Sequence, residues 1–451
     1  MRRIQIIFVS SMIALLYPGC GLTKKKPDDA TSSSSEPPAT ASEAPGVSVS
    51  GDIPDASSVD FIEAEDSVQI SGVNLTTSAK TVSVDAVSIS TDGVPQLSRI
   101  QSMSTSEKSF RFTGLPFETY LVIRVDDKPT SVIQPVNVPG NGATNVGLYA
   151  PMDATAVVTS RMFSLIVETP ASAKAASSLL ADGLLNLPEL AVTAGSMVSG
   201  YQVKKAAESG SNNSGNAAAA PLDLAGITSI FVAHSNEDRL KLPEADRPAY
   251  AKALSRVAAG TMNRSKTRIA NSYAAAHIAS LEVKRQTKEI AVRSGLGAVS
   301  PAEKTIREVA KTNPEVFISY TKSQEVYVKY AVEIDSSGEP PPTAQSEYQN
   351  SSTADYNQYA KNPETFQNYM NDYTPPQLPD SYPEVPSDPG SYTAVPTPSP
   401  SPSPDATPGP GHIPDPEQSP SPDPTPTPTP TPDPTPTPED SPGPETPPEV
   451  P

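Results

Sequence analysis

Proline at almost every second position is the feature that most limits how this chain folds. From about residue 396 the sequence reads PTPSPSPSP and later PTPTPTPTPDPTPTP, and 53 of the 451 residues are proline. Proline lacks a backbone N–H and has a fixed φ, so such a run forms neither helix nor sheet and favours an extended polyproline II conformation. Together with the polar residues before it, this run predicts a disordered, acidic tail rich in proline, threonine and serine over residues 335–451.

The negative charge of the chain is concentrated in that tail. Residues 335–451 hold 18 acidic residues and a single basic one, Lys361, whereas the whole chain has a net charge of −18. The remainder of the protein is therefore nearly neutral. It lacks the excess of lysine and arginine that neutralises phosphates in nucleic-acid binding, so we expect no nucleic-acid partner.

The role of the tail is open at this point. It forms an acidic brush at the surface, with or without glycosylation, or a strut along or through the cell wall, or it is solvated and has no specific partner. Five tyrosines near its start are candidate recognition points for a protein partner: Tyr348, Tyr356, Tyr359, Tyr369 and Tyr373.

The N-terminus has the plan of an export signal. Arg2 and Arg3 precede an apolar run over residues 4–16. As a helix this run covers about 20 Å, which is well short of the roughly 30 Å of bilayer hydrocarbon. The pattern therefore predicts a secretory signal peptide over residues 1–19 and disfavours a permanent membrane span.

The only cysteine of the chain, Cys20, follows this run within the sequence YPGC. The arrangement resembles the lipobox of bacterial lipoproteins; Gly19 suits the position before the cysteine, whereas Tyr17 and Pro18 depart from the family's pattern. The resemblance implies that the Cys20 sulfur receives a diacylglyceryl group and that signal peptidase II cuts before it. Residues 20–45 are then a lipid-anchored, disordered linker.

A second interpretation of the N-terminus is an ordinary secreted protein. Gly19 and Gly21 are a small pair of the kind that signal peptidase I prefers, and cleavage after Gly21 discards Cys20 with the signal. The lysines at positions 24–26 either contact anionic headgroups or form a solvated charge run. With one cysteine in the chain, a disulfide framework is excluded under either interpretation.

Residues 46–150 are predicted to form an antiparallel β-sandwich. Apolar and polar residues alternate in short runs, and turn residues separate the runs. The candidate strands are 47–51, 67–72, 81–90, 109–114, 119–125 and 132–138.

One segment of this region, FRFTGLPFETYLVIRV over residues 110–125, resembles a known strand–turn–strand unit. The unit belongs to carboxypeptidase-regulatory-like and related transthyretin-like sandwich modules. The family's glycine after the proline falls at Glu118. The resemblance implies a spacer, a stabiliser or a ligand-presenting module without catalytic residues. A hairpin of some other sandwich is the alternative.

Residues 151–334 are predicted to form an α-helical domain. Asp153 is a candidate N-cap of a helix, and Ser-Pro-Ala-Glu at 300–303 is a capping box that opens another. The segment 247–293 forms one long helix or two packed helices. In residues 326–334 apolar and polar side chains alternate as they do in a strand. The spacing of the apolar side chains from residue 314 onward nevertheless favours a helix.

Candidate catalytic or metal-binding residues are few. His412 lies in the tail, and His277 is interpreted as a satisfied histidine of a helix. His234 has Asn236, Glu237 and Asp238 nearby, a set able in principle to hold a hard cation, although a cap and turn is the favoured interpretation. Asp126 and Asp127 are typical of a turn before Pro129. No motif for catalysis, a cofactor or a metal ion is found.

The sequence therefore predicts a multidomain, non-catalytic lipoprotein of the cell envelope. It is anchored to a membrane through Cys20, in a bacterial outer membrane facing the periplasm or the surface, and it acts in binding or spacing with a cell-wall component or another protein as partner. Two alternatives stay open: an exported hydrolase with a carboxylate site in the helical domain, and a secreted surface or matrix protein without lipid.

Overall fold

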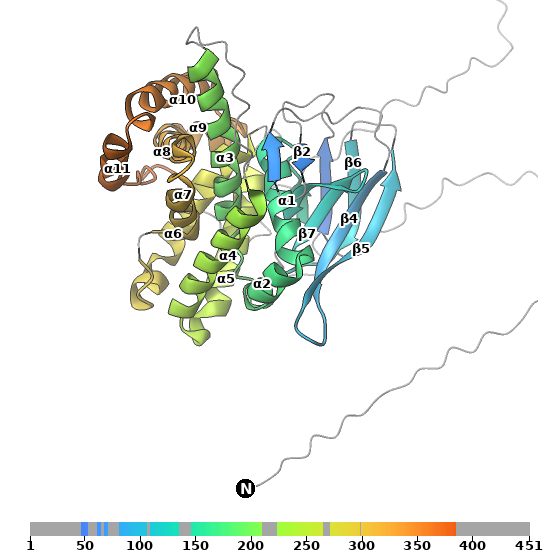
Figure 1. Ribbon diagram of the computed structural model, residues 1–451. Coiled ribbons are helices and arrows are strands. Elements are labelled where there is room, and N and C mark those ends of the chain that lie inside the picture. Colours follow the sequence, from blue (N-terminus) through green and yellow to red (C-terminus); the bar gives the residue numbers. More distant parts are fainter. Residues whose placement is uncertain are drawn as a thin grey trace, which may run out of the picture. The chain divides into compact units, whose positions relative to one another are not determined.

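The computed structural model describes residues 47–52, 61–64, 67–70, 81–105, 109–134, 146–209, 223–264, 271–297 and 299–384. Within these residues a small β region precedes a mostly helical region (Figure 1). The predicted order of a β part followed by an α part is confirmed. The signal peptide, Cys20 and the proline-rich run lie outside the described residues. The sequence also predicts a flexible insertion over residues 209–220, of which all but Ser209 lie outside the described residues.

The described strands make a four-stranded sheet, a three-stranded sheet and a separate pair. The four-stranded sheet has the order β5-β4-β7-β8, the three-stranded sheet has the order β6-β1-β9, and β2 pairs with β3. The strands are β1 (Val47–Asp52), β2 (Phe61–Ala64), β3 (Ser67–Ile70), β4 (Thr81–Ile89), β5 (Pro95–Ser104), β6 (Ser109–Leu115), β7 (Leu121–Val125), β8 (Lys128–Ile133) and β9 (Val146–Tyr149).

One strand pair departs from the antiparallel expectation. β1 runs antiparallel to β6 but parallel to β9. Strands joined by a short turn must run antiparallel, whereas β1 and β9 are separated by the rest of the β region and are free to pair in parallel.

The hairpin between β7 and β8 explains where β8 begins. Asp126 and Asp127 have φ values of 47° and 64°, which is the left-handed geometry that a two-residue hairpin turn requires. β8 therefore starts at Lys128, four residues before the predicted strand. Pro129 is tolerated because β8 is an edge strand, where a missing N–H breaks no ladder.

The central strand β7 is buried on both faces. Leu121, Ile123 and Val125 belong to a hydrophobic cluster that also contains β4 residues and Phe110 and Phe112 of β6. Tyr120, just before the strand, and Val122 belong instead to the cluster formed by the helices. A strand with an apolar layer on each side lacks the polar positions of a half-exposed strand, which accounts for the apolar run over residues 120–123.

The helical region is built from elements whose starts agree with the capping signals. α1 begins after Asp153, whose carboxylate accepts the Ala156 N–H at 2.9 Å, and α7 begins after Ser300, whose hydroxyl accepts the Glu303 N–H at 3.1 Å. The helices are α1 (Ala154–Glu168), α2 (Pro170–Ala181), α3 (Leu187–Ser209), α4 (Leu224–Lys241), η1 (Glu244–Asp246), α5 (Arg247–Arg264), α6 (Ser272–Arg293), α7 (Pro301–Val309), α8 (Pro314–Lys329), α9 (Ala331–Ser337), α10 (Pro342–Asp355), η2 (Tyr356–Ala360) and α11 (Pro363–Asp372).

Two open questions of the sequence are answered by these bounds. Residues 247–293 contain two helices, α5 and α6, rather than one rod. Residues 326–334 are helical, as favoured, because they span the end of α8 and the start of α9.

The helical region extends beyond residue 334, so the predicted start of the tail at residue 335 is wrong. α10, η2 and α11 follow, and Tyr382 is 2% exposed. The tyrosines proposed as recognition points make internal contacts instead. The Tyr348 hydroxyl lies 2.9 Å from that of Ser319, the Tyr369 hydroxyl 2.6 Å from that of Thr321, and the Tyr373 hydroxyl donates to Gln324 at 2.6 Å.

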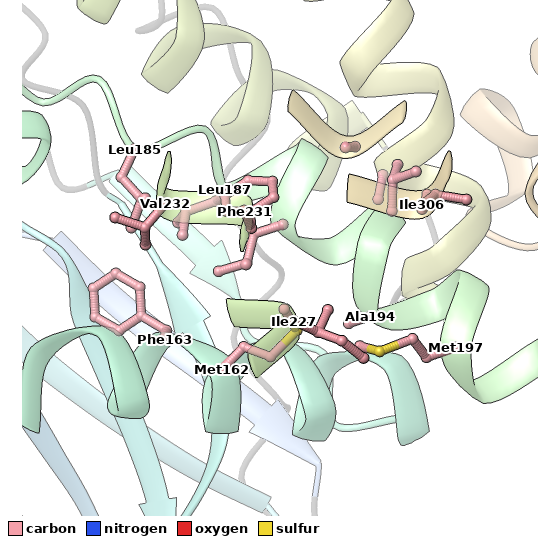
Figure 2. Close-up of a cluster of buried hydrophobic side chains, with 14 of the residues drawn as sticks. Met162, Phe163, Leu185, Leu187, Ala194, Met197, Ile227, Phe231, Val232 and Ile306 are labelled. Carbon is pink, nitrogen blue, oxygen red and sulfur yellow. The ribbon is translucent and has the colours of Figure 1, made fainter. Parts of the chain in front are cut away.

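The main hydrophobic cluster joins the sheet to the helices. α1 contacts β8 and β5 as well as α3 and α4. Figure 2 shows part of this cluster, to which α1, α3, α4 and α7 all contribute side chains. The two regions predicted as separate domains are thus packed together, because the helical cluster includes Tyr120 and Val122 of the β region. None of the described helices combines the length and apolar composition that a membrane span requires.

Candidate functional site

The three histidines do not form a site. His277 is fully buried in α6, its Nε2 lies 2.8 Å from the Ser323 hydroxyl, and burial lowers its pKa to about 3. A serine next to a histidine is the first half of a nucleophilic pair, but such a pair needs a third group that orients the histidine. Among the described residues, His277 Nδ1 has no hydrogen-bond partner. His277 is therefore a core histidine, but the predicted satisfied state is only half met, because Nε2 has a partner and Nδ1 has none among the described residues.

His234 lies between two carboxylates on the surface. Its Nδ1 is 3.3 Å from Glu237 and its Nε2 is 3.0 Å from Glu308. The other two candidate cation ligands have partners elsewhere, because Asn236 donates to the Ala175 carbonyl and Asp238 pairs with Lys304 at 2.7 Å. In the part of the chain that the structure describes, no three metal-binding side chains converge. His412 lies outside that part.

The helices line a cavity of about 550 Å³ that is open to solvent on one side, and its volume falls within the range of about 300–1,000 Å³ typical of small-molecule sites. Its walls come from α3, α4, α5, α6 and the start of α7, and from the segment after α11 that contains Thr374 and Leu378. Most of the wall is apolar. The apolar residues that line it include Leu184, Leu242, Leu254, Leu281, Val283 and Leu296.

Glu189, in the first turn of α3, is the buried charged group of this cavity. It is 3% exposed, and burial raises the pKa of its carboxyl. Its contacts are long: the Ser280 hydroxyl at 3.3 Å, the Ala302 N–H at 3.5 Å and Lys284 Nζ at 3.9 Å. The Ala302 N–H belongs to the first turn of α7, where a negative charge is favoured by the helix dipole.

Tyr250 and Ser235 are two more polar residues of the wall. Tyr250 of α5 lines the cavity, and burial, helped by the nearby Glu189 charge, raises the pKa of its hydroxyl to about 12, so it stays protonated and able to donate. Ser235 of α4 is buried, and its hydroxyl has no hydrogen-bond partner among the described residues. This oxygen is also out of reach of water, so it costs free energy as an unpaired buried polar group and is not available to a ligand in the cavity.

The arrangement is suited to binding a molecule that is largely apolar and carries a few polar groups. The two carboxylates in the wall do not act as a pair, since Asp238 is held by Lys304 and Lys241 while Glu189 is held by Ser280, Ala302 and Lys284.

Neither Glu189 nor the cavity was predicted from the sequence. The available signal was a lone acidic residue inside the apolar stretch LLNLPELAV. Its partners lie 91 and 113 positions away in the chain, so the sequence alone could not place them beside it.

Comparison with known proteins identifies no similar protein. No protein-family model, curated protein sequence or solved structure matches the chain.

Proposed function

We propose that this protein is a non-catalytic lipoprotein of the bacterial cell envelope that binds a small molecule in the cavity between α3, α4, α5, α6 and α7. The cavity is the observation on which this proposal rests. It has the size of a small-molecule site and a mostly apolar wall with polar groups set into it.

The anchor is proposed from the sequence. Cys20 is the only cysteine, and it stands directly after an export signal at the one place where lipidation needs a sulfur. Two or more acyl chains hold a protein firmly, at about 0.8 kcal/mol for each buried CH₂. Residues 21–45 then tether the folded part, and the proline-rich run extends from it as a disordered brush or strut. An outer membrane is the proposed location.

The β region is proposed to be a sandwich that acts as a spacer. Side chains of β6 and of β4, β7 and β8 share one hydrophobic cluster, as two packed sheets do. The resemblance to transthyretin-like modules gains support at Glu118, where the family has glycine, because its φ is 57° and glycine adopts such a value without strain.

An exported hydrolase is the second candidate. Glu189 and Asp238 both line the cavity, which is the observation that favours it. General acid–base catalysis by two carboxyls needs both to reach one reacting group. Here each carboxyl is occupied by its own partners, so binding without turnover is preferred.

A cavity-filling substitution tests the proposed binding. Ala291 of α6 lines the cavity, and Ala171 of α2 is exposed and does not, so Ala291→Phe and Ala171→Phe form a matched pair. We expect the full chain and Ala171→Phe to bind the neutral fluorescent probe Nile red with equal affinity, and Ala291→Phe to bind it about tenfold more weakly. Equal binding by all three proteins contradicts a binding cavity.

The same variants separate binding from hydrolysis. Nitrophenyl esters of short acids should not be turned over by the full chain. Ester turnover that Glu189→Gln or Asp238→Asn abolishes, while Nile red binding is kept, supports the hydrolase instead.

A further inference from the structure

We infer that the cavity takes an amphiphile with a single negative charge, whose anionic head lies at Lys284 and Lys288 and whose apolar body lies against the leucine and valine wall. The inference rests on the proposed binding function and adds the chemical class of the ligand.

The charges around the cavity are unevenly neutralised. Of the cations in its wall, Arg239 pairs with Asp182 at 2.7 Å and Arg285 pairs with Glu282 at 2.7 Å. Lys284 has only the Glu189 carboxylate, at 3.9 Å. Lys288 is exposed and has no ion-pair partner among the described residues.

Lys284 and Lys288 are placed to act on one ligand group. They are four positions apart on α6, so their side chains lie on the same face of that helix. With Glu189 beside Lys284, two lysines face one carboxylate, which leaves one positive charge. A single positive charge suits a carboxylate head better than a doubly charged phosphate monoester, and it repels an ammonium head.

The carboxylates in the wall already have partners within the protein, so they do not favour a cationic ligand. Asp238 is held by Lys304 at 2.7 Å and Lys241 at 3.2 Å. Glu189 is held by the Ala302 N–H at the start of α7, by Ser280 and by Lys284. Both negative charges therefore have cations or N–H donors within the protein.

The rest of the wall indicates that the remainder of the ligand is apolar. Val292 is 71% exposed and Val299 is 40% exposed, and both line the cavity. Large apolar side chains that water reaches at a cavity are covered when an apolar chain enters it.

Three probes with one twelve-carbon chain test the inference: dodecanoate, dodecanol and dodecyltrimethylammonium, titrated calorimetrically into the full chain below their micelle concentrations. We expect dodecanoate to bind about tenfold more tightly than dodecanol, and the ammonium probe to bind most weakly. Lys288→Met should remove the preference for dodecanoate over dodecanol, and Lys288→Glu should turn it toward the ammonium probe. Lys174→Met, an exposed lysine of α2 outside the cavity wall, should leave it unchanged.

The outcomes separate the two proposals. Equal binding of the three probes, lost in Ala291→Phe, overturns the anionic head and leaves the binding function in place. Tightest binding of the ammonium probe by the full chain also overturns it. Failure of all three probes and of Nile red contradicts the binding function itself.

Discussion

The Tyr120 hydroxyl donates a hydrogen bond to the carbonyl oxygen of Leu185, 3.1 Å away, and this contact ties the four-stranded sheet to the helices. The Tyr120 ring also lies 5.4 Å from the ring of Phe163 in α1, measured between centroids. Both residues are buried, so the sheet and the helices depend on each other for their stability.

Tyr120→Phe removes the hydroxyl and leaves the Leu185 carbonyl without this donor. The free energy of unfolding should fall by about 1–2 kcal/mol, because an unpaired buried polar group keeps its desolvation cost. Urea unfolding followed by far-UV circular dichroism and by tyrosine fluorescence checks the value. Both signals should move together; two separate transitions would contradict the packing of the sheet against the helices.

Arg124 is expected to be the most important cation of the β region. Its guanidinium lies 2.6 Å from Asp85 of β4 and 2.5 Å from Glu168 at the end of α1. The Asp85 side chain is 7% exposed, so Arg124→Met leaves a buried carboxylate with one fewer partner and should cost about 2–3 kcal/mol.

Arg99 provides the matched control for Arg124. It also contacts Asp85, at 3.0 Å, but its side chain is 43% exposed. Arg99→Met should cost under about 1 kcal/mol, as exposed ion pairs do. Equal losses in the two variants, measured by chemical unfolding, would contradict the importance given to the buried pair.

Glu118→Gly should stabilise the protein. Glu118 is exposed and has a φ of 57°, a left-handed conformation that strains a residue with a Cβ atom and that glycine adopts freely. After the greater entropy of glycine in the unfolded chain is subtracted, a gain of about 0.5–1 kcal/mol is expected. The midpoint of thermal unfolding should rise. A lower midpoint would indicate that the Glu118 side chain makes a stabilising contact that outweighs the strain.

His277 should make the protein sensitive to acid. Burial lowers its pKa to about 3, whereas in the unfolded chain it is near the usual value of about 6.5. Between these values the unfolded state binds more protons, so this contribution is present above about pH 6.5 and is lost as the pH falls toward 3. From pH 7 to pH 4 the loss is about 3 kcal/mol.

Unfolding of His277→Gln and the unaltered chain at both pH values isolates this contribution. The variant should be less stable than the unaltered chain at pH 7, and it should lose less stability on acidification. His234→Gln, which removes the surface histidine, should keep the acid sensitivity. A pH dependence that is the same with and without His277 would show that this histidine is not held neutral by burial.

Much of the fold could be predicted from local signals. Alternation identified β4, β6 and β7, and the caps at Asp153 and Ser300 marked the starts of α1 and α7, because each signal depends on residues within one turn or strand. β5 was missed because this edge strand is mostly exposed and polar, with no apolar alternation to reveal it.

The end of the helical region could not be found in the same way. α10 and α11 carry few apolar side chains, and their order depends on distant partners. Phe366 and Tyr369 of α11 pack at ring-centroid distances of 6.2 and 6.1 Å from Phe317 of α8. Tyrosines that the sequence places in a polar tail therefore pack against the hydrophobic core, and only the fold brings them to α8.

The cavity depends on the fold to a still greater degree. Glu189, Tyr250, Lys284 and Ser300 come from four different helices or their caps, and each taken alone is an ordinary polar residue of an ordinary helix. The sequence alone, without the fold, provides Cys20 and the apolar run before it, and the proposed location of the protein rests on these two features.

The intact mass of the mature protein purified from its own host tests that central claim most directly, with Cys20→Ala as the matched variant and detergent partitioning of both. A lipoprotein should begin at Cys20, carry the added mass of its acyl chains and partition with the membrane, whereas Cys20→Ala should lose that partitioning. A mature chain that begins at Leu22 without added mass would contradict the account, because Cys20 would then be part of a discarded signal and the protein would act free of the membrane.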